Sequence, residues 1–205
     1  MTDAPKYDPD EKPNSVEECV IFIDNYITCE RDSDPSLEPY LRYQLHRHSH
    51  TCKRIVKGVQ SCRFGLPKPP MPSTCILTPL SDIIEEQAEK QAKKDFCAVM
   101  KNLNNKGRNF TDDIPFEEFL HELGLSQPAY ILAVRSSLKR PTVFLKRRTC
   151  DIFINAYNKD LLRTWRANVD VQFVLDPYAC GKYCVAYLSK ATGGISKLLR
   201  QVHIK

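Results

Sequence analysis

Three histidines and two cysteines lie within 17 consecutive positions of this 205-residue chain, and their side chains are typical zinc ligands. They are His46, His48, His50, Cys52 and Cys62. Neutral imidazole and thiolate are the usual donors to zinc, and an irregular loop can arrange four of them as a tetrahedron. The spacing matches no standard zinc finger, because no cysteine pair or histidine pair frames the segment at finger spacing. We predict a structural zinc site formed by His46, His48, Cys52 and Cys62.

A simpler interpretation of the same segment has free thiols and a histidine cluster that faces nucleic acid. The sequence leaves the choice of ligands open, and His50 and Cys29 are further candidates. The remaining cysteines with apolar neighbours are expected in the core: Cys19, Cys97, Cys150 and Cys184. The first 13 residues are acidic and proline-rich, with no apolar stretch behind them, so we expect no signal peptide, reduced thiols, and a nuclear or cytoplasmic location.

A second candidate for chemistry is a tyrosine pair near the C-terminus. Tyr183 and Tyr187 are four positions apart in a predicted helix, so both side chains lie on one face, with Lys182 and Lys190 beside them. A phenol is a weak nucleophile at neutral pH unless a metal or cation polarises the electrophile. Two such tyrosines could attack phosphodiester bonds in turn. Tyrosine pairs at this spacing are more often core aromatics, so the pair alone does not establish a nuclease.

The charge distribution favours a polyanionic partner more than the net charge of +5 indicates. Basic and acidic residues number 3 and 11 in 1–40, 7 and 0 in 41–80, 6 and 10 in 81–134, and 14 and 4 in 135–205. Two basic blocks therefore alternate with two acidic ones, which is typical of a surface that binds nucleic acid, although a mixed solvated surface would also produce it. The predicted contacts to DNA phosphates are Lys182, Lys190, Arg147 and Arg148.

The composition excludes some classes of protein. Apolar residues make up 42% and charged residues 27% of the chain, as in an ordinary globular protein. No apolar run reaches the 18 or so residues of a membrane-spanning helix, so we expect no membrane partner. The phosphate-binding pattern G-x-x-x-x-G-K-[ST] is absent, which excludes an NTPase of that type within this chain.

The elements that must position these residues divide the chain near residue 140. Apolar periodicity predicts helices over 15–28, 37–45, 82–103, 116–123 and 126–138. The first helix is expected to begin with a capping box formed by Ser15 and Glu18. The prolines of 48–80 predict an irregular segment.

Beyond residue 140 the pattern changes to strands mixed with helices. We predict a strand or hairpin over 141–154, a helix over 158–167, a strand over 169–175 and a helix from 176 or 177. The fold class is therefore α+β. Its expected parts are a flexible acidic start (1–14), a helical segment with the zinc loop (15–80), a helical insertion (81–139) and a partial antiparallel sheet with the tyrosine helix (140–205).

The motifs at the C-terminal end resemble those of the Rep domain of Helitron rolling-circle transposases, often labelled the Helitron helicase-like domain. The matching residues are Asn155, Tyr157, Asn158, Leu161, Leu162, Asn168, Val169, Val171, Lys182, Tyr183, Tyr187 and Lys190. The earlier run HRHSHTCKR with SCRFGLPKPPM resembles the family's His/Cys segment and the element after it, with Leu66 where the family usually has Phe. The resemblance spans nearly the whole chain and is most specific in the last 65 residues.

The resemblance implies an HUH-type endonuclease of a transposable element, with Tyr183 and Tyr187 as paired nucleophiles in rolling-circle replication. One tyrosine would cut single-stranded DNA, keep the 5′ phosphate covalently and leave a free 3′ hydroxyl. In the family, Mg²⁺ or Mn²⁺ bound by a His-hydrophobic-His strand polarises the scissile phosphate. The implied partner of this chain is single-stranded DNA, and its implied 140–205 part is Rep-like.

The sequence departs from the family in its metal-binding strand. The two H-x-H pairs are His46-Arg47-His48 and His48-Ser49-His50, both with a polar central residue, and we read neither as the catalytic pair. In the family, that strand and the helicase lie on either side of the stretch that this chain resembles. We therefore expect a truncated Rep-like fragment with little or no nicking activity.

Two other functions are compatible with the same residues. The first is a non-catalytic, zinc-supported module that binds single-stranded DNA, with Trp165, Tyr157 or Tyr178 as stacking surfaces for bases. The second is a transposon remnant without a function of its own. The sequence does not determine DNA specificity, oligomeric state or which tyrosine acts first.

Overall fold

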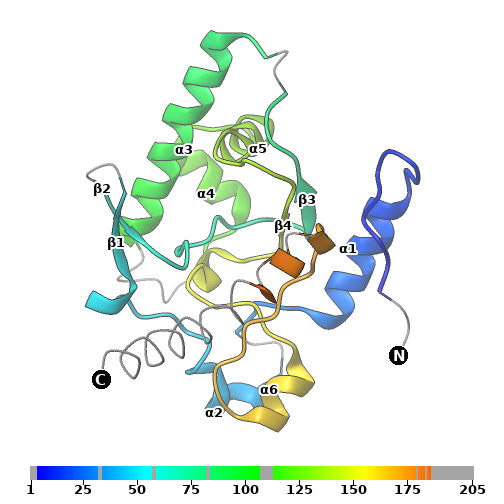
Figure 1. The fold of residues 1–205 in the computed structure, drawn as a ribbon. Helices are drawn as coiled ribbons and strands as arrows, with labels where there is room; N and C mark the ends of the chain where they lie inside the picture. Colours follow the sequence, from blue (N-terminus) through cyan, green and yellow to red (C-terminus); the bar gives the residue numbers. More distant parts are fainter. Residues whose placement is uncertain are drawn as a thin grey trace, which may run out of the picture. The chain divides into compact units, whose positions relative to one another are not determined.

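The computed structural model describes two units of the chain, Met1–Phe173 and Val174–Lys205, each considered by itself (Figure 1). The described residues are 4–31, 34–56, 59–81, 84–106, 113–178, 180–182 and 184–185. Helices combine with small antiparallel sheets in the first unit, so the predicted α+β class is confirmed at that level.

Helix α1 (Ser15–Tyr26) begins where the sequence predicts, but with a different cap. Its N-cap residue is Asn14, and no side chain caps the first turn. Ser15 is buried, and its Oγ accepts a hydrogen bond from the Asp8 N–H at 3.1 Å. The predicted capping box is therefore wrong, because Ser15 holds the preceding loop against the helix. Cys19 and Ile23 form the fully buried face of α1.

Three helices build the first core. They are α3 (Glu86–Lys106), α4 (Phe116–Leu123) and α5 (Gln127–Ser136). Gly124 ends α4 in the left-handed conformation at φ 67°, and the Ser126 Oγ caps α5 by accepting a bond from the Ala129 N–H. Both local signals were predicted correctly. Helix α3 starts at Glu86, later than its predicted first residue.

The buried side chains of this core come from helices and from the proline-rich segment. They are Met71, Val99, Leu103, Phe119, Leu120, Tyr130, Val134 and Ile152. The Tyr130 hydroxyl donates to the Pro70 carbonyl at 2.9 Å, which attaches the proline-rich segment to α5. The prolines therefore contribute to the core as an ordered segment.

A second core is formed by residues from two distant parts of the sequence, 29–41 and 154–162. Short helices η1 (Pro35–Leu37), α2 (Glu38–Leu41) and α6 (Lys159–Trp165) surround it. Its buried residues are Cys29, Leu37, Leu41, Ile154, Tyr157 and Leu162. Isolated bridges pair Thr28 with Tyr157 and Leu45 with Ile154.

Three strands form within the segment 48–80, which was predicted to be irregular, and they belong to two small antiparallel sheets. Strand β1 (Lys53–Val56) pairs with β2 (Val59–Cys62), and β3 (Cys75–Leu77) pairs with β4 (Thr142–Phe144). The prediction was wrong for the strands because the prolines lie between them, where they cost no ladder hydrogen bond. The hairpin alternative for 141–154 was also wrong, since β4 pairs with a strand from far upstream.

The strand predicted for 169–175 does not form. Its alternating apolar residues are used in side-chain packing: Val169 contacts the second core, and the Phe173 ring lies 5.8 Å from that of Phe22. The described residues of 177–185 are helical, as predicted. The predicted Rep-like sheet stays a prediction.

Candidate metal centre

The loop after α2 and the β1–β2 hairpin bring four of the predicted ligands together. The backbone N–H of His46 donates to the Phe153 carbonyl at 2.9 Å, which fixes the loop to the segment before α6. A 3-10 helix, η2 (His50–Cys52), then leads into β1. Because β2 returns antiparallel, Cys62 pairs with Lys53, and the Arg63 N–H donates to the Cys52 carbonyl at 2.7 Å. The hairpin therefore places Cys62 next to Cys52.

The ligand atoms of His46, His48, Cys52 and Cys62, hereafter the His/Cys group, all lie within 4.8 Å of one another and could hold a metal ion. His46 Nε2 lies 3.2 Å from His48 Nδ1, Cys52 Sγ lies 3.4 Å from His48 Nδ1, and Cys62 Sγ lies 3.5 Å from His46 Nε2. Tetrahedral zinc with ordinary bond lengths would separate two nitrogens by about 3.3 Å and a nitrogen from a sulfur by about 3.6 Å. Three of the six distances between ligand atoms therefore match a tetrahedral zinc site, and the other three pairs lie within 4.8 Å.

Contacts around the group hold the ligands in place. Cys52 is buried, and its Sγ accepts a hydrogen bond from the Ser49 N–H at 3.3 Å. The His48 ring packs edge-on against Phe153 at 5.4 Å, and the His46 ring against Phe64 at 5.5 Å. Such neighbours orient the ligands of a metal site and stabilise a thiolate.

Electrostatics favour the neutral imidazoles that a metal requires. Burial lowers the pKa of His46, and the neighbouring His48 lowers it further. Burial also lowers the pKa of His48, with an additional contribution from Lys53. Both rings therefore offer a nitrogen lone pair at neutral pH.

The structure separates the other candidate ligands from this group. His50 is exposed at the start of η2 and is not a member of the group. Cys29 lies in the second core, where its Sγ donates to the Lys146 carbonyl at 3.3 Å and burial raises its pKa to about 11. A protonated, hydrogen-bonded thiol in that position does not serve the metal site.

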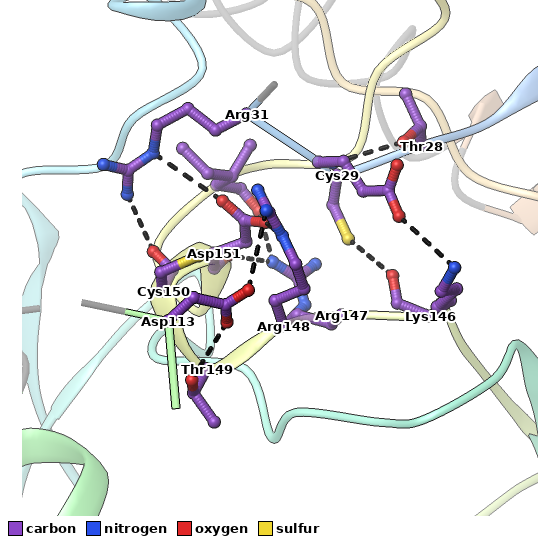
Figure 2. A network of polar contacts seen from close by, with 12 residues as sticks. Thr28, Cys29, Arg31, Asp113, Lys146, Arg147, Arg148, Thr149, Cys150 and Asp151 are labelled. Atoms are coloured by element: carbon purple, nitrogen blue, oxygen red, sulfur yellow. Dashed lines mark hydrogen bonds and ion pairs between the residues drawn. The ribbon is translucent and has the colours of Figure 1, made fainter. Parts of the chain in front are cut away.

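The expectation that Arg147 binds DNA phosphates is corrected by the structure. Arg147 is only 6% exposed, and its guanidinium donates to the carbonyls of Asp151 at 2.6 Å and Ile154 at 2.8 Å (Figure 2). Arg148 is bound to carboxylates, with Nε 2.8 Å from Asp151 Oδ2 and Nη1 3.6 Å from Asp113 Oδ2. The basic pair in the sequence therefore serves the protein interior and its own acidic neighbours.

Arg31, from the segment after α1, lies near the same Asp151 carboxylate (Figure 2). Its Nη2 donates to the Cys150 carbonyl at 2.7 Å, and its Nε lies 3.6 Å from Asp151 Oδ1. Asp151 is completely buried. We call Arg31, Arg147, Arg148 and Asp151 the arginine–aspartate cluster. The cluster was not predicted, because Arg31 lies 120 positions before Asp151 and no local pattern relates the two residues.

Both predicted catalytic residues and one of the predicted phosphate contacts lie outside the described part of the chain. These residues are Tyr183, Tyr187 and Lys190, so the tyrosine pair stays a prediction. Lys182 is described and exposed, with its ammonium 4.8 Å from the centre of the Tyr178 ring.

Two further expectations are corrected by burial. Tyr157 cannot stack on a base, because it is completely buried and its hydroxyl donates to the Glu30 carbonyl at 2.7 Å. Cys19 and Cys150 are buried as predicted, but Cys97 and Cys184 are exposed. Helical spacing alone did not reveal on which side of its helix each thiol lies.

Comparisons of the chain with protein-family models, with curated proteins and with solved structures find no significant match. Among the described residues, no helix has both the length and the apolar character needed to span a bilayer. The functional argument therefore depends on the residues of the site.

Proposed function

We propose that the chain binds one structural zinc ion through the His/Cys group and that this centre supports a domain for binding single-stranded DNA. The observation that carries the proposal is the convergence of two imidazole nitrogens and two thiols within 4.8 Å. The η2 turn and the β1–β2 hairpin bring these side chains together, and two imidazoles with two thiols are a donor set typical of zinc.

The ligand set favours zinc over other common cations. Mg²⁺ and Ca²⁺ prefer oxygen ligands, whereas thiolate and imidazole suit zinc. Four protein ligands would complete a tetrahedron and leave no open position for substrate, which is typical of structural sites. Zinc would therefore hold η2 and the β1–β2 hairpin to the loop that begins at His46.

The charge of the surrounding segment supports DNA as the partner. Residues 41–80 contain seven basic and no acidic side chains. Arg47, Lys53, Arg54 and Arg63 are exposed, and none of them forms an ion pair within the part of the chain that the structure describes. A zinc ion bound by two thiolates is neutral as a unit, so these cations stay available for phosphates.

The relationship to Helitron Rep domains is part of this proposal and carries a specific expectation about activity. Both H-x-H pairs of the chain contain His48, which is a member of the His/Cys group. While zinc occupies that group, neither pair can supply the catalytic metal for Tyr183 and Tyr187. We therefore propose DNA binding with little or no nicking by this chain alone.

Metal analysis of the purified chain tests the central claim. We expect one zinc per chain, and less than a tenth of that in Cys52→Ala, since removing one of four ligands opens the site. Cys97→Ala is the matched control, because Cys97 is an exposed thiol outside the group and should keep full zinc content. Wild-type protein that is folded but takes up no zinc would contradict the proposal.

Incubation with single-stranded DNA and Mn²⁺ tests the expectation about nicking. We expect reversible binding that weakens steeply with salt, and no covalent product. A protein–DNA band that resists denaturation and disappears in Tyr183→Phe or Tyr187→Phe would show that the chain is an active nickase.

A further inference from the structure

One exposed aromatic side chain, Phe64, lies directly against the His/Cys group. Phe64 is 50% exposed, and its ring lies 5.5 Å from the ring of His46, at an interplanar angle of 68°. The Arg63 guanidinium lies 4.7 Å from the centre of the Phe64 ring. We call Arg63 and Phe64 the Phe64 platform.

The backbone around the platform is fixed to two of the candidate metal ligands. On one side of Phe64, the Arg63 N–H donates to the Cys52 carbonyl at 2.7 Å. On the other side, the Gly65 N–H donates to the Cys62 carbonyl at 3.0 Å, with Gly65 in the left-handed region at φ 66°. The ring is therefore held on a short, hydrogen-bonded turn, and half of its surface is open to a ligand.

Cations without acidic partners surround the platform. In the β1–β2 register Lys53 is opposite Cys62, so both side chains lie on the same face of the hairpin. Arg47 lies between two members of the His/Cys group in the chain and is exposed. No carboxylate occurs in 41–80, so the segment itself presents only positive charge to an anionic ligand.

The two most exposed aromatics of the described residues, Trp165 and Tyr178, have carboxylates in their surroundings. Trp165 is 70% exposed on α6, where the nearby cation Arg163 already pairs with Asp34 at 2.7 Å and Asp160 at 2.6 Å. Tyr178 is 72% exposed, but its backbone N–H is bonded to the Asp176 carboxylate at 3.0 Å. Electrostatics therefore favour the Phe64 platform over Trp165 and Tyr178. Tyr43 also has an arginine over its ring, Arg42 at 4.8 Å, but Phe64 is the more exposed ring and contacts the His/Cys group.

We propose that a base of single-stranded DNA stacks on Phe64, while Arg63, Lys53 and Arg47 bind the adjacent phosphates. The inference rests on the proposed function and assigns it to one surface. A single strand supplies both features that the platform matches, a π-face and a closely spaced row of negative charges. A duplex offers the charges but keeps its base faces stacked, so we expect it to bind more weakly than the single strand.

Fluorescence anisotropy with labelled 20-nucleotide oligothymidine tests the platform, with the zinc content of every variant measured beforehand. Phe64→Ala should weaken binding about 5- to 150-fold, the usual loss for one stacked base. Phe64→Trp should bind within about threefold of the wild type, because it keeps a ring. Ile21→Ala is the control, as an exposed apolar side chain of α1 outside the platform, and should bind like the wild type.

The salt dependence separates stacking from phosphate binding. Lys53→Gln should reduce the slope of log K against log salt by about 0.7, the value for one phosphate contact on a single strand, whereas Phe64→Ala should leave it unchanged. Wild-type affinity in a zinc-loaded Phe64→Ala variant, or equal affinity for a duplex of the same length, would overturn the platform and leave the proposed function intact. A wild-type chain that binds neither zinc nor oligothymidine at low salt would overturn both.

Discussion

Two polar clusters of the first unit differ in the kinds of side chain that they bring together. The His/Cys group collects like donors, two imidazoles and two thiols, at a partly exposed hairpin. The arginine–aspartate cluster collects opposite charges around Asp151, which is fully buried (Figure 2). Opposite charges with hydrogen-bonded neighbours can be satisfied internally, whereas four metal-type donors need an external cation. We therefore propose that the first cluster holds a metal ion, whereas the second stabilises the fold.

Removing the carboxylate from the arginine–aspartate cluster should cause the largest loss of stability. Asp151→Ala leaves the buried guanidinium of Arg147 without its neighbouring negative charge, and we expect a loss of about 3–5 kcal/mol in the free energy of unfolding. Urea denaturation followed by circular dichroism measures it. Asp160→Ala is the control, because the Asp160–Arg163 pair is exposed and should contribute almost nothing. Equal stability of the two variants would contradict the claim that the arginine–aspartate cluster stabilises the fold.

Chelation should affect only the other cluster. Removing zinc should lower the unfolding midpoint, with a free-energy change of roughly 4 kcal/mol if free zinc was 1,000 times its Kd. A thermal melt with and without a chelator measures this shift, and Cys52→Ala should abolish it. The Asp151→Ala variant should keep the shift, since its cluster contains no metal ligand. A wild-type midpoint that does not respond to chelator would contradict a zinc-supported fold.

High pH should weaken the second core through Cys29. Burial raises the pKa of this thiol from 9.0 to about 11, so its contribution is fully present below pH 9 and is lost as pH rises toward 11, where the unfolded thiol ionises first. The contribution is roughly 3 kcal/mol for a shift of two pKa units. Cys29→Ala should therefore lose less stability between pH 8.5 and pH 10.5 than the wild type. An identical pH dependence for the two proteins would show that Cys29 is not protected.

Thiol labelling should distinguish the clusters without unfolding the chain. At pH 8 iodoacetamide should modify exposed Cys97 and Cys180 and leave buried Cys29 unmodified. Cys52 and Cys62 should react only after chelation, because zinc binds their thiolates. Mass spectrometry of peptides reports each site. Equal labelling of Cys62 with and without chelator would count against a metal at this site.

Local signals predicted much of the helical structure. Gly124 ends α4 and Ser126 begins α5 as their residue types indicate, because caps and left-handed glycines act over one turn of chain. The predicted capping box at Ser15 was wrong because the Ser15 hydroxyl is bonded to a residue outside the helix. That hydroxyl is bonded to Asp8, in a loop whose position the helix pattern does not reveal.

The His/Cys group was predictable as a set because its members lie within 17 positions. Their exact choice required the hairpin, which separates His50 from the group and brings Cys62 next to Cys52. Phe64, the proposed stacking surface, was not among the predicted ones, although its position near Cys62 in a basic segment was a usable signal. Tyr157 was wrongly included because aromatic character does not indicate exposure.

The sequence by itself determined the basic character of 41–80, the presence of metal-binding side chains and the positions where most helices begin and end. These properties depend on residue type and on neighbours within a few positions. Only the tertiary structure decided that Arg147 is buried and that Arg31 reaches Asp151. Burial and long-range pairing depend on how distant segments pack. The type of a residue and its neighbours in the sequence therefore do not show whether an arginine is buried or exposed.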